Sequence, residues 1–264
     1  MLLAIDVGNT NTVFALHDRG EFVAEWRMKT DGARTADEYF VWLRQLMDFQ
    51  NIGVRAVRHA ICSSVAPKTV FNIKRLCETY FGCTPLFIGG AGTRLPVEVR
   101  VDAPQEVGAD RIVNTVGAFG KYGPNLIVID FGTATTFDVV AADGAYVGGV
   151  IAPGVNLSIE ALHRAAARLP NIDVARPAEV VGRDTLSCMR SGAYWGYISL
   201  IEGICARIDA ERGVTSTVIA TGGLSALFAK ATEAIHHVDP DVTMRGLVDI
   251  HAYNLDAAPA VGGA

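Results

Sequence analysis

The sequence predicts an α/β protein with two halves, each beginning with a buried strand and a tight turn. The chain has 264 residues, of which 50% are hydrophobic, enough to bury the cores of two ordinary domains. A strand-turn-strand pattern occurs twice, at residues 2–16 and 125–140, and segments with helical periodicity follow each copy. We therefore expect an N-terminal domain of residues 1–115 and a C-terminal domain of residues 116–264.

The first copy reads LLAIDVGNTNTVFAL, a strand interrupted by Asp6, Gly8 and small polar residues. The β-branched residues that follow disfavour a helix, and Asp18-Arg19-Gly20 signals a turn before EFVAEW. This pattern predicts a β-hairpin. It excludes the strand-to-helix loop of Rossmann and Walker sites, and neither G-x-G-x-x-G nor G-x-x-x-x-G-K-[ST] occurs in the chain.

The second copy reads NLIVIDFGTATTFDVV and repeats D-x-G-x-x-x-T at an offset of 124 residues, from position 6 to position 130. Asp143-Gly144 signals its hairpin turn before AYVGGVIA. Three shared identities can arise by chance. The simplest interpretation is nevertheless two halves that each start a sheet around the same turn.

Both turns suit phosphate binding, because their glycines let backbone amides approach a ligand and their polar side chains add neutral donors. Those side chains are Asn9, Thr10, Thr12, Thr133, Thr135 and Thr136. Asp6 and Asp130 cannot bind phosphate directly, but a carboxylate beside bound phosphate suits a cation. Alternatively, Asp and Asn only initiate tight turns. Two copies in the same order favour a phosphate site divided between the turns.

The segment from Asp102 to Gly123, DAPQEVGADRIVNTVGAFGKYG, predicts a helix that begins near Gly108. Its apolar positions at helical spacing are Ile112, Val113, Val116 and Phe119. Asp110 and Arg111 then project from the first turn, where Asp110 could accept a proton from a substrate hydroxyl and Arg111 could bind a carboxylate. The alternative is that Asp110 only complements the helix dipole.

Two other helices are predicted without chemistry of their own. Thr35 and Glu38 form a capping box before an amphipathic helix with Phe40, Leu43 and Met47 on its buried face. In a helix from Thr185 to Asp209, Gly192 and Gly196 permit close approach, either in the core or between subunits. Thr221-Gly222-Gly223 suits a strand-to-helix turn near a nucleotide, or a plain loop.

Composition favours a small-molecule partner in a reducing compartment. The net charge is −5 and the basic residues are scattered, which argues against nucleic acid or an anionic membrane as the main partner. Five cysteines without C-x-x-C spacing, and a start without a leader pattern, predict a cytoplasmic protein. No segment is apolar over the length of a membrane span, and no spacing predicts a zinc knuckle.

Six blocks in this order resemble the type III pantothenate kinase family of bacteria. They are AIDVGNTNTVFAL, EVGADRIVNTVGAF, VIDFGTATTFDVV, GGVIAPG, GRDTLSCMRSG and ATGGLS, and they span nearly the whole chain. The first and third blocks alone mark only the wider superfamily of actin, sugar kinases and heat-shock-chaperone ATPases. EVGADR followed by DFGTATT is specific to the family.

The resemblance implies two ribonuclease-H-like domains of the actin-like ATPase type, with mixed sheets flanked by helices and a cleft between them. It implies a homodimer that uses ATP with Mg²⁺ and a monovalent cation, K⁺ or NH₄⁺. The expected reaction phosphorylates the primary hydroxyl of pantothenate to 4'-phosphopantothenate, the first step towards coenzyme A.

The resemblance also implies roles for particular residues. The first ATP-binding turn is Asp6, Val7, Gly8, Asn9, Thr10, Asn11, Thr12 and Val13, with Thr133 as a further ATP contact. Pantothenate is expected at Val101, Gly108, Ala109, Asp110, Arg111 and Thr185, with Asp110 as proton acceptor. Asp130 is the expected ligand of the monovalent cation, and Asp6 is a second candidate metal ligand. Val101 departs from the family, because many members carry tyrosine there.

Two other functions fit the same turns. Another kinase or ATPase of the superfamily would keep both turns and use a different acceptor. A nucleotide-binding regulator descended from such a kinase would have lost turnover, but the presence of Asp6, Asp110, Arg111 and Asp130 together argues against it.

Overall fold

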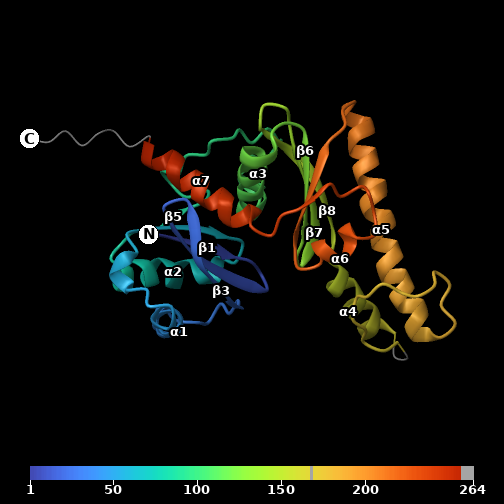
Figure 1. The fold of residues 1–264 in the computed structure, drawn as a ribbon, viewed down its shortest axis with the longest axis horizontal. Helices are drawn as coiled ribbons and strands as arrows, with labels where there is room; N and C mark the ends of the chain where they lie inside the picture. Colours follow the sequence, from blue (N-terminus) through green and yellow to red (C-terminus); the bar gives the residue numbers. More distant parts are fainter. Residues whose placement is uncertain (167–168, 257–264) are drawn as a thin grey trace, which may run out of the picture. The chain divides into compact units, whose positions relative to one another are not determined.

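The computed structural model describes residues 1–166 and 169–256, which form two compact units (Figure 1). Unit 1 comprises Met1–Gly117 together with the segment from Val242 onward, and unit 2 comprises Ala118–Asp241. The sequence predicts a domain boundary after residue 115 and assigns the end of the chain to the second domain. Residues 257–264 of that end lie outside the described ranges. In the structure the division follows Gly117, and the last helix belongs to unit 1.

Unit 1 is a mixed five-stranded sheet in the order β3-β2-β1-β4-β5, flanked by helices. Its strands are β1 (Leu2–Val7), β2 (Asn11–Asp18), β3 (Glu21–Lys29), β4 (His59–Ser64) and β5 (Leu86–Phe87). Its helices are α1 (Ala36–Phe49), α2 (Pro67–Leu76), the first part of α3 (Ala109–Tyr122) and α7 (Val242–Asp256), with short turns η1 (Val54–Ala56), η2 (Cys77–Phe81) and η3 (Pro104–Glu106). β1 runs antiparallel to β2 and parallel to β4.

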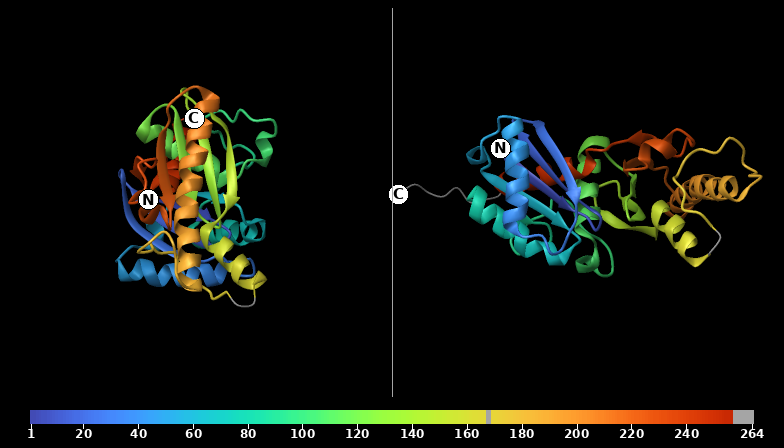
Figure 2. Two further views of the ribbon diagram at one scale, coloured as in Figure 1. Left: turned by 90° about the vertical axis from the view of Figure 1, so that its right-hand side faces the viewer. Right: turned by 90° about the horizontal axis from the view of Figure 1, so that it is seen from below.

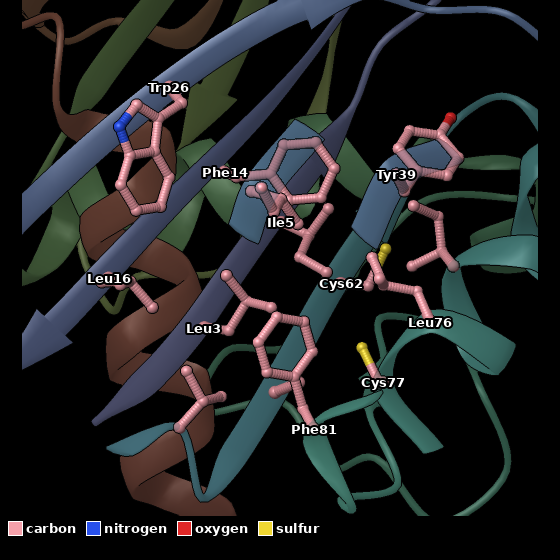
Figure 3. Packing of buried hydrophobic residues seen from close by; sticks show 14 of the residues in the cluster. Leu3, Ile5, Phe14, Leu16, Trp26, Tyr39, Cys62, Leu76, Cys77 and Phe81 are labelled. Carbon is pink, nitrogen blue, oxygen red and sulfur yellow. The ribbon is translucent and has the colours of Figure 1, made fainter. Parts of the chain in front are cut away.

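The side chains of β1 alternate between two apolar layers. Leu3 and Ile5 pack with α1 and α2 in a core that Figure 3 shows from close by. Leu2 and Ala4 instead pack against residues of α3 and α7. Because side chains two residues apart share a face of the sheet, Asp6 lies on the face that α3 and α7 cover.

Unit 2 repeats this architecture. Its sheet has the order β10-β9-β6-β7-β8, in which the central strand is again antiparallel to the strand that follows it and parallel to a later one. The elements are β6 (Leu126–Phe131), β7 (Ala134–Val140), β8 (Tyr146–Pro153), β9 (Thr217–Gly222), β10 (His237–Val238), α4 (Val155–Ala165), α5 (Thr185–Arg212) and α6 (Ser225–Ala229). The prediction of two α/β halves with ribonuclease-H-like mixed sheets is confirmed.

The capping box predicted at Thr35 and Glu38 is confirmed. Thr35 caps α1, with the Glu38 amide donating to its hydroxyl at 3.3 Å and its own amide donating to the Glu38 carboxylate at 2.8 Å. Leu43 and Met47 are buried. All five cysteines are free thiols. Among the helices in the described ranges, none combines the length and apolar character that a bilayer crossing needs.

Candidate functional site

The first turn connects β1 to β2 as the predicted hairpin. The Gly8 amide donates to the Asn11 carbonyl at 3.0 Å, which closes the turn. Asn9, Thr10 and Asn11 are exposed, whereas Thr12 is fully buried. The turn therefore offers its polar groups to a ligand at its tip, and its base is part of the core.

Thr30 holds this turn from outside it, and the sequence does not single this residue out. It follows β3, whose last residue, Lys29, pairs with Asn11. The Thr30 amide donates to the Thr10 carbonyl at 2.9 Å, and its hydroxyl donates to the Gly8 carbonyl at 2.8 Å. The three-strand meander carries a signal for this residue. Because β3 runs antiparallel to β2, the end of β3 lies beside the start of β2 and hence beside the first turn.

The second turn, between β6 and β7, is also a hairpin and is one residue shorter than the first. The Gly132 amide donates to the Ala134 carbonyl at 3.0 Å, and Thr133 is exposed. The Gly154 amide, at the end of β8, donates to the Thr133 carbonyl at 3.1 Å. A β-carbon at Gly154 would lie 2.7 Å from the Gly132 carbonyl oxygen, so only glycine fits beside this turn.

Asp130 lies beside Gly222 at the end of β9. A β-carbon at Gly222 would lie 2.7 Å from the Asp130 Oδ1 and 2.6 Å from the Phe131 carbonyl oxygen, and Gly222 has φ +86°. A carboxylate and a carbonyl thus border the same small space. Oxygen donors of this kind suit a hard cation, so these residues fit the cation that the sequence predicts.

The described residues contain no group of three or more His, Cys, Asp or Glu side chains that could hold a metal ion. Mg²⁺ that enters with a nucleotide needs only one or two carboxylates, because phosphate oxygens and water complete its shell. Asp6 and Asp130 could each serve in this way.

Asp110 is the second residue of α3, as the sequence predicts, and its side chain is partly buried. Burial raises the pKa of Asp110, while the amide and the guanidinium of Arg111 act in the opposite direction. The Arg111 amide donates to the Asp110 Oδ1 at 2.8 Å, which fixes the carboxylate. A carboxylate with a raised pKa is a better proton acceptor near neutral pH than an exposed one.

The first turns of α3 lie over the same face of the sheet as Asp6. Ala109 and Val113 pack in the layer that also contains Leu2 and Ala4 of β1. Unit 1 therefore carries the start of α3 and the residue Asp6, which precedes the first turn, on one face of its sheet.

Ser63 of β4 pairs in register with Asp6 and was not singled out by the sequence. It is fully buried, and its hydroxyl makes no hydrogen bond.

The remaining predicted residues lie elsewhere. Val101 is a half-buried residue in a bend between β5 and α3 of unit 1. Thr185 is the exposed first residue of α5 in unit 2, directly after the capping residue Asp184. Asp130 and Thr133 also belong to unit 2.

Comparisons with known proteins identify the family. Residues 2–207 match the family model described as type III pantothenate kinase. A curated relative from Dinoroseobacter shibae bearing that name is 58% identical over 97% of this chain and 100% of its own length. A relative from Caulobacter vibrioides is 57% identical over 96% of this chain and 98% of its own length, and also bears the name.

Solved structures agree on the fold. A Campylobacter jejuni protein named as a Baf family transcriptional activator superposes with a TM-score of 0.60 at 18% identity, over 96% of this chain and 99% of its own. A 2-dehydro-3-deoxygalactonokinase-like protein from Sinorhizobium meliloti superposes with a TM-score of 0.57 at 13% identity, over 100% and 99% of the two chains. From the family model and the curated relatives, this chain belongs to the type III pantothenate kinase family, whose members transfer phosphate to an alcohol.

Proposed function

We propose that the chain transfers the γ-phosphoryl group of ATP to the primary hydroxyl of pantothenate, producing 4'-phosphopantothenate in the first step towards coenzyme A. The observation that carries the proposal is the pair Asp110 and Arg111 at the start of α3. The pair places a partly buried carboxylate of raised pKa next to a guanidinium in a helix that lies over the same face of the sheet as Asp6. Pantothenate needs both groups, because it has a hydroxyl to deprotonate and a carboxylate to bind.

The two turns bind the phosphates of ATP. Asn9, Thr10 and Asn11 are exposed at the first turn, and Thr133 is exposed at the second. Phosphoryl transfer asks a protein mainly for alignment and for stabilisation of charge, so neutral donors on closed turns are the expected machinery. Asp6 and Asp130 would hold the cations, which would supply positive charge to the phosphate oxygens.

In the chemical step, the pantothenate hydroxyl oxygen forms a bond to the γ-phosphorus as the bond from that phosphorus to the β,γ-bridging oxygen breaks. Asp110 accepts the hydroxyl proton, and ADP leaves with the electron pair of the broken bond. Arg111 binds the carboxylate of pantothenate in fork geometry. Thr185 is a further contact to pantothenate. Val101 supplies an apolar side chain, so the polar groups of pantothenate are held by other residues.

The chain acts as a homodimer in which α5 contributes a subunit contact. Gly192 and Gly196 are exposed, and a β-carbon at either position would meet nothing within 4 Å. The glycines therefore have no packing role in the described part of the chain. Light scattering of wild type and of Gly196→Leu tests this proposal, because a bulky side chain at a subunit contact should shift the mass towards the monomer. An unchanged dimer would place the contact elsewhere.

Phosphorus NMR of a reaction with ATP, Mg²⁺, K⁺ and pantothenate tests the reaction. A phosphate on a primary alcohol couples to two methylene protons and gives a triplet, whereas one on a secondary alcohol gives a doublet. We expect a triplet that grows in step with ADP. A doublet would mean that the wrong hydroxyl was assigned, and free phosphate alone would mean that the chain is an ATPase.

A further inference from the structure

We infer that the side chains of Thr12 and Thr30 hold the first phosphate turn in shape, and that neither donates a hydrogen bond to bound phosphate. The inference rests on the proposed role of this turn in binding ATP. It gives the hydroxyl of Thr12 a different task from the exposed polar groups of the same turn.

The hydrogen bonds of Thr30 determine which hydroxyl is the donor. A threonine hydroxyl has one proton to donate. Thr30 donates its proton to the Gly8 carbonyl at 2.8 Å. The 2.9 Å contact between the Thr12 and Thr30 hydroxyls must therefore use the proton of Thr12. With that proton committed, Thr12 has none to offer to a phosphate oxygen.

Burial supports this assignment. Thr12 is fully buried, whereas Asn9, Thr10 and Asn11 at the tip are exposed. The phenol of Tyr39 in α1, itself fully buried, makes no hydrogen bond, so it does not compete with Thr30 for the Thr12 proton. The Thr12 hydroxyl thus faces the protein interior, away from the surface where a nucleotide would bind.

The network also constrains the backbone of the turn. Thr30 engages the carbonyls of Gly8 and Thr10 together, through its hydroxyl and its amide. With both carbonyls bonded towards β3, the turn is held in the form in which its tip amides remain available to an anion. The two threonines are therefore positioning residues for the amides of the turn.

In unit 2, the corresponding turn is held by a backbone amide, with no threonine hydroxyl. Gly154 follows β8 as Thr30 follows β3, and the Gly154 amide donates to the Thr133 carbonyl as the Thr30 amide does to the Thr10 carbonyl. Gly154 has no side chain, and its backbone packs directly on the turn instead. The hydroxyl brace is thus particular to the first turn, and its loss should leave the second turn intact.

A double-mutant cycle on Thr12 and Thr30 tests the inference, with the affinity for MgATP measured by calorimetry and KM and kcat measured by ADP release. Thr30→Val removes both hydroxyl bonds at nearly constant shape. We expect the Kd and KM for ATP to rise on the order of ten-fold, with the KM for pantothenate unchanged. Thr30→Ser should restore wild-type values. The Thr12→Val/Thr30→Val double variant should bind ATP no worse than Thr30→Val, because both hydroxyls act in one network.

Thr93→Val is the matched control, because Thr93 also donates its hydroxyl to a carbonyl of unit 1, that of Phe87 at 2.8 Å, outside the proposed site. It should leave the affinity for ATP unchanged. Wild-type affinity for ATP in Thr30→Val, or additive losses in the double variant, would overturn the inference. A wild-type chain that binds no ATP would instead overturn the proposed function of the turn.

A measurement on the wild type covers the case in which a variant does not fold. In protein labelled at threonine methyl groups, a non-hydrolysable ATP analogue with Mg²⁺ should shift the Thr10 resonance more than those of Thr12 and Thr30. A shift of Thr12 as large as that of Thr10 would place Thr12 in contact with phosphate and contradict the inference.

Discussion

Gly108 leaves free the space next to the carboxylate of Asp110. A β-carbon at Gly108 would lie 2.5 Å from the Asp110 Oδ1, a distance at which one of the two groups must move. Glycine at this position thus allows the proposed base to occupy the orientation that the Arg111 amide fixes.

Gly108→Ala should therefore displace the carboxylate of Asp110 and lower kcat by about 10- to 100-fold, because misplacing a catalytic group by about 1 Å has effects of this size. Gly53→Ala is the control, since a β-carbon there meets nothing within 4 Å. Steady-state kinetics of both variants check the prediction. Equal kcat values in the two variants would remove Gly108 from the positioning of the base.

Asp110→Asn should lower kcat by about 10²- to 10⁴-fold while it raises stability at neutral pH. Burial raises the pKa of Asp110, so over a range above its ordinary pKa the folded chain keeps a proton that the unfolded chain has lost. Unfolding in that range releases the proton, and the contribution of Asp110 to stability therefore falls as the pH rises through it. Asparagine has no such charge to bury.

Thermal unfolding from about pH 4 to pH 8 measures this effect, the range being set by the ordinary pKa of an aspartate. The Tm of Asp110→Asn relative to wild type should increase with pH and then level off. A difference in Tm that is independent of pH would show that the carboxylate is not destabilised by burial.

Gly222→Ala should impair the proposed cation site in unit 2. The substitution places a methyl group against the Asp130 carboxylate and forces alanine into a left-handed conformation at φ +86°, which costs about 1 kcal/mol or more. We expect activation by K⁺ to require a higher concentration than in wild type. Gly223→Ala serves as the neighbour control, because a β-carbon there has open space. If wild type and Gly222→Ala were activated by the same K⁺ concentrations, Asp130 would not be a ligand of the cation.

Gly246 and Gly117 allow α7 and α3 to cross with their backbones in contact. A β-carbon at Gly246 would overlap the Val113 carbonyl, and one at Gly117 would lie 2.8 Å from the Gly246 amide nitrogen. Gly246→Ala should destabilise the fold by about 1–3 kcal/mol through overpacking. Denaturant unfolding of Gly246→Ala and of Gly53→Ala, a glycine of unit 1 with open space, checks this. A stabilised Gly246→Ala would refute the close crossing.

The features that the sequence predicts correctly depend on local patterns. The hairpins after Asp6 and Asp130, the capping box at Thr35 and the start of α3 near Gly108 each depend on residues within a few positions of one another. Local spacing is sufficient to encode such turns and caps.

The features that it misses depend on chain segments that are far apart. Thr30 contacts Gly8 only because the pairing of β1, β2 and β3 brings the end of β3 beside the first turn. Gly222 lies beside Asp130 only because β9 pairs with β6. The return of α7 to unit 1 depends on its contact with α3 at Gly117 and Gly246. A single sequence carries no direct signal for such contacts, because period and propensity describe each segment by itself.

The most direct test of the central claim is an ADP-release assay with ATP, Mg²⁺ and K⁺ that compares pantothenate with a panel of sugars and short carboxylic acids, for wild type and Asp110→Asn. The account predicts turnover with pantothenate alone, reduced by about 10²- to 10⁴-fold in the folded variant. Turnover with another acceptor or with water, or wild-type turnover in Asp110→Asn, would contradict it.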